Sequence, residues 1–162
     1  DTIYLAPIPT NDWVPFICGK FAEKGKSISE EWAGRICSFV SNHSSYVQQL
    51  AWNIMINTET EVTEEIFQQA VSELLDQSSP LFIQQIQGLT TYQMNLIRCL
   101  CQGIHKDFTS KEVLETYQLG SKSNISRLKM ALIEKEIIEE DGVSLTLVDP
   151  VFALWFKKEY MN

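Results

Sequence analysis

The side chains best suited to bind a ligand lie along one segment, residues 121–135. This segment carries four basic groups against a single acid, Glu134. At 100° per residue, Ile125, Leu128 and Leu132 share one helical face with Ser121, and that face is expected to be buried. The opposite face is expected to present Lys122, Ser123, Ser126, Arg127, Lys129 and Met130. Small polar groups beside an arginine can meet phosphates or base edges, and the same face can contact a protein. We therefore predict a surface for DNA or partner binding here.

Two neighbouring features favour a protein partner over DNA. Met130 and Ile133 are expected to point outward, and outward apolar side chains are typical of protein-contact surfaces. The hairpin that follows is acidic where a DNA-binding wing would carry Lys or Arg, and its acids are Glu136, Glu139, Glu140 and Asp141. Contacts with phosphates dominate affinity for DNA, so these acids oppose it. DNA binding stays as the alternative interpretation.

A second string, F-A-E-K-G-K-S at residues 21–27, resembles a phosphate-binding loop in composition only. Lys20 stands where the first glycine of a P-loop is required. The string also follows a predicted helix rather than a strand, so its amides cannot cradle a phosphate. We interpret it as the end of a helix. Since no acidic strand end suits a Walker B motif either, we predict no catalytic residue and no enzymatic activity for this chain.

Composition narrows the class of protein. Of 162 residues, 44% are hydrophobic and 21% are charged, which is typical of an ordered globular chain. The net charge of −8 is uneven, because residues 1–80 carry a net −7 and residues 81–162 a net −1. Binding to nucleic acid would therefore need a local basic patch. No apolar run could span a bilayer and no signal peptide is recognisable, so we predict a cytoplasmic protein without membrane contact.

The cysteines do not predict a metal site. Cys18, Cys37, Cys99 and Cys101 lie in amphipathic segments and lack the spacing of zinc ligands, and only two histidines accompany them. Four reduced thiols are the prediction.

The first half of the chain predicts a strand and then a helical bundle. Residues 2–9 read as a short strand, which would need a partner strand. Residues 10–78 contain four amphipathic helical patterns joined by short loops. The expected caps of these helices are Thr10, Ser29, Thr63 and either Asn42 or Ser44. Residues expected to face inward include Trp13, Phe16, Ile17, Phe21, Trp32, Ile36, Phe39, Val40, Tyr46, Val47, Leu50, Ala51, Trp52, Ile54, Ile66, Phe67, Ala70 and Leu74.

The second half predicts a winged-helix domain over residues 90–162. Ser78-Ser79-Pro80 is expected to break the bundle, with residues 79–89 as a connector. A short helix capped by Thr109 or Ser110 is followed by the turn Leu119-Gly120-Ser121 and the basic helix. The fold class is therefore mainly α, a four-helix lid-type bundle followed by a winged helix with a short β-hairpin wing.

The wing and the last helix have their own signals. Asp141-Gly142 predicts a type I′ hairpin turn, with Val143, Leu145 and Leu147 alternating on the return strand. Aromatic residues of the last helix, Phe152, Trp155 and Phe156, are expected to close the core, and a docking face is the alternative.

A strand, a four-helix bundle and a winged helix, in that order, resemble the C-terminal half of a P-loop ATPase of the AAA-like/STAND group. Residues 42–51, N-H-S-S-Y-V-Q-Q-L-A, are similar to an N-H-P-Y-Y-V-Q-Q-L-A lid segment of a prokaryotic ATPase family. Residues 149–156, D-P-V-F-A-L-W-F, are similar to the D-P-V-F-x-L-W-F tail of the same family. The opening I-Y-L-A-P-I-P looks like the last strand of a nucleotide-binding core.

The resemblance implies that a missing N-terminal ATPase core binds ATP and Mg²⁺, while this chain holds no cofactor itself. It also implies that Asn42, His43 and Tyr46 face the nucleotide, with ordinary packing at a helix start as the alternative. The chain departs from the family in having Ser44 or Ser45 where relatives usually have Pro, and in having no Arg or Lys on the third helix. These departures argue against direct phosphate sensing by the lid.

The predicted function is that of a non-catalytic regulatory part of an ATP-binding ATPase, coupling nucleotide state to a protein partner. A winged-helix DNA-binding regulator is the first alternative, with the bundle as a ligand or dimerisation domain. A protein-interaction module is the second.

Overall fold

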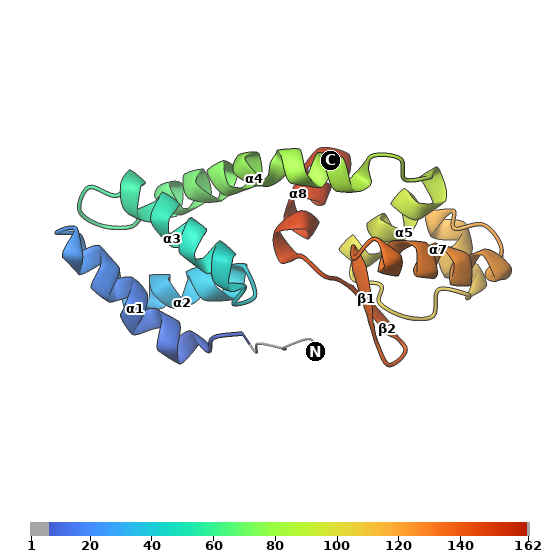
Figure 1. Ribbon diagram of the computed structural model, residues 1–162, viewed down its shortest axis with the longest axis horizontal. Helices are drawn as coiled ribbons and strands as arrows, with labels where there is room; N and C mark the ends of the chain where they lie inside the picture. The colour runs from blue at the N-terminus through green and yellow to red at the C-terminus, as the bar shows by residue number, and fades with distance from the viewer. Residues whose placement is uncertain (1–6, 162) are drawn as a thin grey trace. The chain divides into compact units, whose positions relative to one another are not determined.

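The computed structural model describes residues 7–161, and the chain divides into two units between Ser78 and Ser79 (Figure 1). The first unit contains α1 (Thr10–Glu23), α2 (Glu30–Phe39), α3 (Ser44–Asn57) and most of α4 (Glu64–Ile86). The second contains the end of α4, α5 (Thr91–Cys101), α6 (Lys111–Tyr117), α7 (Lys122–Glu134), β1 (Ile138–Asp141), β2 (Ser144–Leu147) and α8 (Pro150–Tyr160). This mainly helical fold with one antiparallel hairpin confirms the predicted class. The strand predicted over 2–9 lies largely outside the described residues, and residues 7–9 form no strand.

The first unit is built around a stripe from each helix. Trp13, Ile17 and Phe21 of α1 are buried at a spacing of four residues, and α1 lies against α2. The buried amide of Asn53 joins α3 to α4, because its Nδ2 donates to the carbonyl of Ala70 at 3.3 Å. The other buried hydrophobic residues of the unit are Ala33, Ile36, Cys37, Val40, Val47, Leu50, Ile54, Met55, Phe67, Ala70, Val71, Leu74 and Leu75.

Two of the predicted caps of this unit are confirmed and two are wrong. Ser29 Oγ accepts from the Trp32 amide at 3.1 Å, and Thr63 Oγ1 accepts from the Ile66 amide at 3.2 Å. Thr10 is instead the first residue of α1, and its side chain does not cap the helix. The cap of α3 is His43, without a side-chain hydrogen bond, rather than Asn42 or Ser44.

Two predicted core residues are exposed. Phe16 is 49% exposed and Trp52 is 52% exposed. At 100° per residue, Phe16 lies at the edge of the buried stripe of α1, whereas Trp52 lies outside the stripe that Val47, Leu50 and Ile54 form on α3. Helical spacing alone could not distinguish an edge position such as that of Phe16 from a central one, and the spacing of α3 did not support a core position for Trp52.

The boundary between the two units does fall at Ser78-Ser79, as predicted, but the helix does not break there, because α4 continues through Pro80 to Ile86. A proline inside a helix removes one backbone hydrogen bond. Contacts within the second unit hold the last turns in place: Phe82 is fully buried, with its ring centroid 5.4 Å from that of Phe152 and 5.4 Å from that of Trp155. Trp155 Nε1 also donates to Ser79 Oγ at 3.0 Å.

The second unit has the predicted winged-helix order. Thr90 and Gln93 form a reciprocal capping box at the start of α5, and Ser110 Oγ accepts from the Val113 amide at the start of α6. Gly120 makes the turn before α7 with φ of +86°, which a glycine adopts at little cost. Phe152, Trp155 and Phe156 are buried, which confirms that they close the core.

The wing differs from the prediction by one residue. Asp141 pairs with Ser144 as the last rung of the hairpin, so the two-residue loop is Gly142-Val143 rather than Asp141-Gly142. Gly142 has φ of +62° at the first loop position, the glycine-first arrangement of a type II′ turn. Val143 is therefore 83% exposed at the tip instead of facing inward, whereas Leu145 is buried.

Candidate functional site

The α7 helix places the predicted recognition residues on one exposed face. Ile125, Leu128 and Leu132 are buried, and α7 lies against α5 and β1. The opposite side chains reach solvent, and Met130 is 69% exposed. The exposed residues are Lys122, Ser123, Ser126, Arg127 and Met130, while Lys129 is half-buried. Five of the six predicted residues therefore lie on an open surface. We call these five residues and Lys129 the α7 face.

A polar hollow of 250 Å³ lies beside the first turn of α7. Its lining includes Ser123 and Arg127 from the α7 face, and Tyr92, which is 48% exposed. Asn124 also lines it, and its Nδ2 donates to the carbonyl of Leu119 at 3.2 Å. Tyr92 and Asn124 were not predicted to belong to this surface. Tyr92 lies in the first turn of α5 and is not needed for the buried stripe of that helix. That position could have indicated that its side chain is exposed.

The acidic wing reaches back to the α7 face. Lys129 Nζ lies 2.5 Å from Glu140 Oε1 on β1, and both side chains are partly exposed. This ion pair joins residues eleven positions apart and was not predicted. The Glu140 carboxylate partly neutralises Lys129, so the α7 face attracts the phosphates of a nucleic acid less strongly.

The three residues predicted to face a nucleotide lie together at the start of α3. Asn42 adopts a left-handed conformation with φ of +57°, and its Oδ1 accepts from Thr10 Oγ1 at 3.1 Å. The His43 and Tyr46 rings lie 4.5 Å apart between centroids, and His43 Nδ1 is 3.3 Å from Ser45 Oγ. The hydrogen bond from Thr10 therefore ties this turn to α1.

The string F-A-E-K-G-K-S is the end of a helix, as predicted. Helix α1 ends at Glu23, Lys24 is its C-cap, and Gly25 has φ of +69°. Lys26 Nζ donates to the carbonyl of Met55 at 2.7 Å. Its ammonium thus ties α1 to the end of α3.

Arg35 is the only arginine of the first unit, and it is engaged within that unit. Both of its terminal nitrogens donate to the Glu64 carboxylate, and its guanidinium lies 4.2 Å from the Phe67 ring centroid. The hydrogen bonds from Arg35, with one from Gln68, lower the pKa of Glu64 to about 2. Arg35 therefore acts as an internal tie between α2 and α4.

We expect the Glu64 carboxyl to titrate near pH 2 in the native chain, and to return toward its ordinary pKa of 4.5 in Arg35→Ala. Because the native pKa is depressed, the pair stabilises the fold above about pH 4.5, and that contribution is lost as pH falls toward 2. Carboxyl-detected NMR titration measures both values. A native pKa near 4.5 for Glu64 would contradict the bidentate pair.

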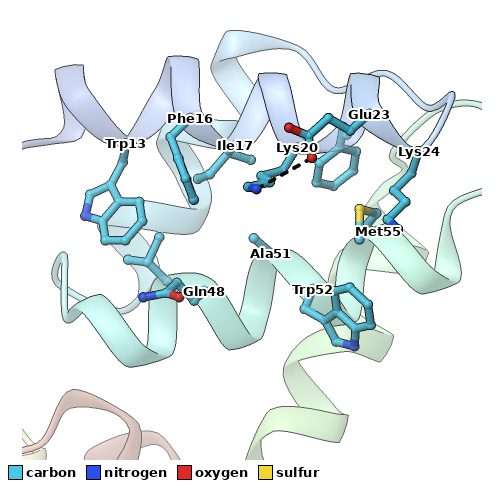
Figure 2. A pocket seen from close by; sticks show the side chains of 12 residues that line it. Trp13, Phe16, Ile17, Lys20, Glu23, Lys24, Gln48, Ala51, Trp52 and Met55 are labelled. Carbon is cyan, nitrogen blue, oxygen red and sulfur yellow. Dashed lines mark ion pairs between the residues drawn. The ribbon is translucent and has the colours of Figure 1, made fainter.

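An apolar groove of 380 Å³ lies between α1 and α3. Figure 2 shows Phe16, Ile17 and Lys20 of α1 pointing into it, with Ala51 of α3 across. Its remaining lining residues are Trp13, Phe21, Glu23, Lys24, Val47, Gln48, Trp52 and Met55. The sequence pattern placed most of these residues in the core and gave no sign of a groove.

The four cysteines are free thiols. Cys37, Cys99 and Cys101 are buried and Cys18 is half-buried. Burial raises the pKa of Cys99 and of Cys101 to about 11, so both stay protonated at neutral pH and are poor nucleophiles. Over residues 7–161, the structure groups no three His, Cys, Asp or Glu side chains suited to a metal ion. Over the same residues, no helix has the length and apolar character to cross a membrane.

Comparison with known proteins agrees with this architecture. Residues 80–158 match the family model described as "Probable winged helix domain". A Walker-type ATPase of Pyrococcus abyssi has a similar structure, with a TM-score of 0.73 and 15% sequence identity over 93% of this chain. The chain spans 42% of that ATPase's length, and at this identity the likeness establishes the fold alone. None of the curated proteins matches the chain. The second unit is a winged-helix domain, and the resemblance to part of a P-loop ATPase is confirmed at the level of fold.

Proposed function

We propose that this chain is the non-catalytic lid and winged-helix part of an ATP-binding ATPase, and that it relays nucleotide state to a protein partner. The shared fold with a Walker-type ATPase supports the first half of the proposal. The residues of this chain are not suited to binding the phosphates of ATP, because the loop-like string at residues 21–27 is the end of α1 and Arg35 is paired with Glu64. ATP and Mg²⁺ would accordingly be bound by a separate core domain.

One observation carries the protein-contact half of the proposal: the acidic wing is paired with the α7 face through Lys129 and Glu140. Four acids at residues 136–141 oppose a net charge of +3 over residues 121–135. The Lys129–Glu140 pair lies well within one Debye length at physiological salt, so the acidic wing reduces the attraction of the α7 face for a phosphate backbone. Met130, exposed beside them, suits an apolar contact with a protein.

The lid half of the proposal rests on the turn that begins α3. Asn42, His43 and Tyr46 are gathered there, and the hydrogen bond from Thr10 fixes the turn to α1. A nucleotide that contacts this turn in only one of its states would shift the first unit between two positions, which is sufficient for a relay.

The reading frame that encodes this chain tests the proposal. A G-x-x-x-x-G-K-[ST] motif is expected about 150–250 residues before Asp1, because a domain of that size must supply the phosphate loop. The complete polypeptide should bind ATP with Mg²⁺, and should lose that binding when the lysine of the motif is changed to alanine. A reading frame without such a loop would contradict the proposal.

DNA binding is a second candidate function, favoured by Arg127, Ser123 and Ser126 on the open first turns of α7. We expect the chain to bind mixed-sequence duplex no tighter than about 10⁻⁵ M near physiological salt, which is within the non-specific range. Fluorescence anisotropy measures this, with Arg127→Ala compared with Lys111→Ala on α6. Sub-micromolar, sequence-selective binding that only Arg127→Ala removes would instead support a DNA-binding regulator.

A further inference from the structure

The groove between α1 and α3 presents large aromatic side chains to solvent. Phe16 from α1 and Trp52 from α3 line it, and each is about half exposed, at 49% and 52%. Between them lie Ile17 and Ala51, so the floor of the groove is apolar (Figure 2). Half-exposed aromatic residues around an apolar floor are typical of the centre of a protein-binding surface.

The charge around this groove differs from the rest of the first unit. That unit is strongly acidic, and its four basic side chains are Lys20, Lys24, Lys26 and Arg35. Arg35 is paired with Glu64, whereas the three lysines all lie at the groove. Lys20 and Lys24 line it, and Lys26 donates to the carbonyl of Met55, another lining residue. Glu23 is the one acid among the lining residues, and it lies 3.5 Å from Lys20.

Lys24 marks one end of the groove, because it follows the last turn of α1, while Trp13 lines the groove near the start of that helix. The Lys20 ammonium reaches back over the Phe16 ring, 5.5 Å from its centroid, and the Lys26 ammonium donates to the Met55 carbonyl. The surface is therefore mainly apolar with the Lys24 ammonium at the C-terminal end of α1, which suits an apolar ligand that has a carboxylate at that end.

We propose that the α1–α3 groove binds an amphipathic helix of a partner protein, with an acidic residue of that helix beside Lys24. Both walls are helices whose backbone hydrogen bonds are made internally, so an added β-strand would find no edge to pair with. A helix can instead seat apolar residues at i, i+3, i+4 and i+7 between the ridges of α1 and α3. This inference rests on the first unit alone and stands independently of the role proposed for the α7 face.

A helical peptide library tests the proposal on the full chain. The probes are 16-residue peptides with leucine at i, i+3, i+4 and i+7, and with Ala, Gln, Glu or Lys varied elsewhere. Peptides selected for binding are expected to carry Glu at one end of the leucine stripe. Trp52→Ala and Ala51→Glu should each lower the affinity for these peptides about tenfold or more, as expected for a central contact of a binding surface. Ile56→Ala is the matched control, since Ile56 is 55% exposed on the same helix but does not line the groove.

Charge reversal tests the orientation. Lys24→Glu should lower the affinity for the selected peptides about tenfold. A peptide with Lys in place of its Glu should bind that variant with the affinity restored. Circular dichroism establishes that each variant stays folded. Peptides that bind Ala51→Glu as well as the native chain, or a stripe that selects no acidic residue, would overturn the proposal. So would concentration-dependent dimerisation abolished by Trp52→Ala, which would assign the groove to a second copy of the chain.

Discussion

Replacing Trp155 by alanine is expected to lower the free energy of unfolding of the winged-helix domain by about 3–5 kcal/mol, the usual cost of truncating a buried tryptophan. Trp155 is 2% exposed, and its ring packs at a tilt against the rings of Phe82 and Phe152. Its Nε1 donates a hydrogen bond to Ser79 Oγ. The substitution would thus remove both the packing and the polar tie that hold the last turns of α4. Urea denaturation followed by circular dichroism measures the change.

Trp155→Phe is the matched control for that experiment. It keeps most of the ring contact but removes the Nε1 donor, so we expect a loss of about 1 kcal/mol from the hydrogen bond, with a smaller cost of lost volume. The first unit does not contain Trp155, and its unfolding midpoint should stay unchanged. Equal losses for Ala and Phe would show that the hydrogen bond, and not the packing, holds this part of the domain.

Reversing the charge of the wing is expected to convert the α7 face into a DNA-binding surface. The variant Glu139→Lys, Glu140→Lys, Asp141→Lys releases Lys129 from its ion pair and changes the local charge by six units. Each additional phosphate contact steepens the salt dependence of log K by about one unit. With one to three new contacts, affinity for mixed duplex at about 50 mM salt should rise by roughly 10–1000-fold.

The control for this variant makes the same change of charge in the other unit, with Glu59→Lys, Glu61→Lys, Glu65→Lys. All three residues are exposed. If only long-range attraction between the added positive charge and DNA mattered, both variants would gain the same DNA affinity. Anisotropy titrations at several salt concentrations separate the two cases by their slopes. If the wing variant binds DNA no better than its control, the wing does not determine what the α7 face binds.

The parts of this structure that were predictable from the sequence are those set by neighbouring residues. Ser29, Thr63 and Ser110 cap their helices because each hydroxyl meets an amide three residues later. Gly120 makes its turn for a similarly local reason. The buried face of α7 follows from helical spacing alone, and its polar face was therefore predicted as well.

The features that the sequence did not reveal depend on contacts between distant residues. Pro80 remains inside α4 because Phe82 packs against Phe152, seventy positions away. Lys129 meets Glu140 only after the hairpin folds back, and Arg35 meets Glu64 across two helices. Phe16 was expected in the core from its helical spacing and Trp52 was expected in the core as well, and only the placement of neighbouring helices shows that they line an open groove.

In the proposed relay, the first unit and the α7 face respond to a nucleotide that is bound outside this chain. Hydrogen–deuterium exchange of the complete polypeptide, with ATP and Mg²⁺ compared with ADP, measures this response. Amide protection is expected to change between the two nucleotides at residues 42–46 and along α7, while the buried core of α5 and α8 stays constant. Identical exchange of residues 42–46 and α7 in both states, with a clear response at the phosphate loop, would contradict it.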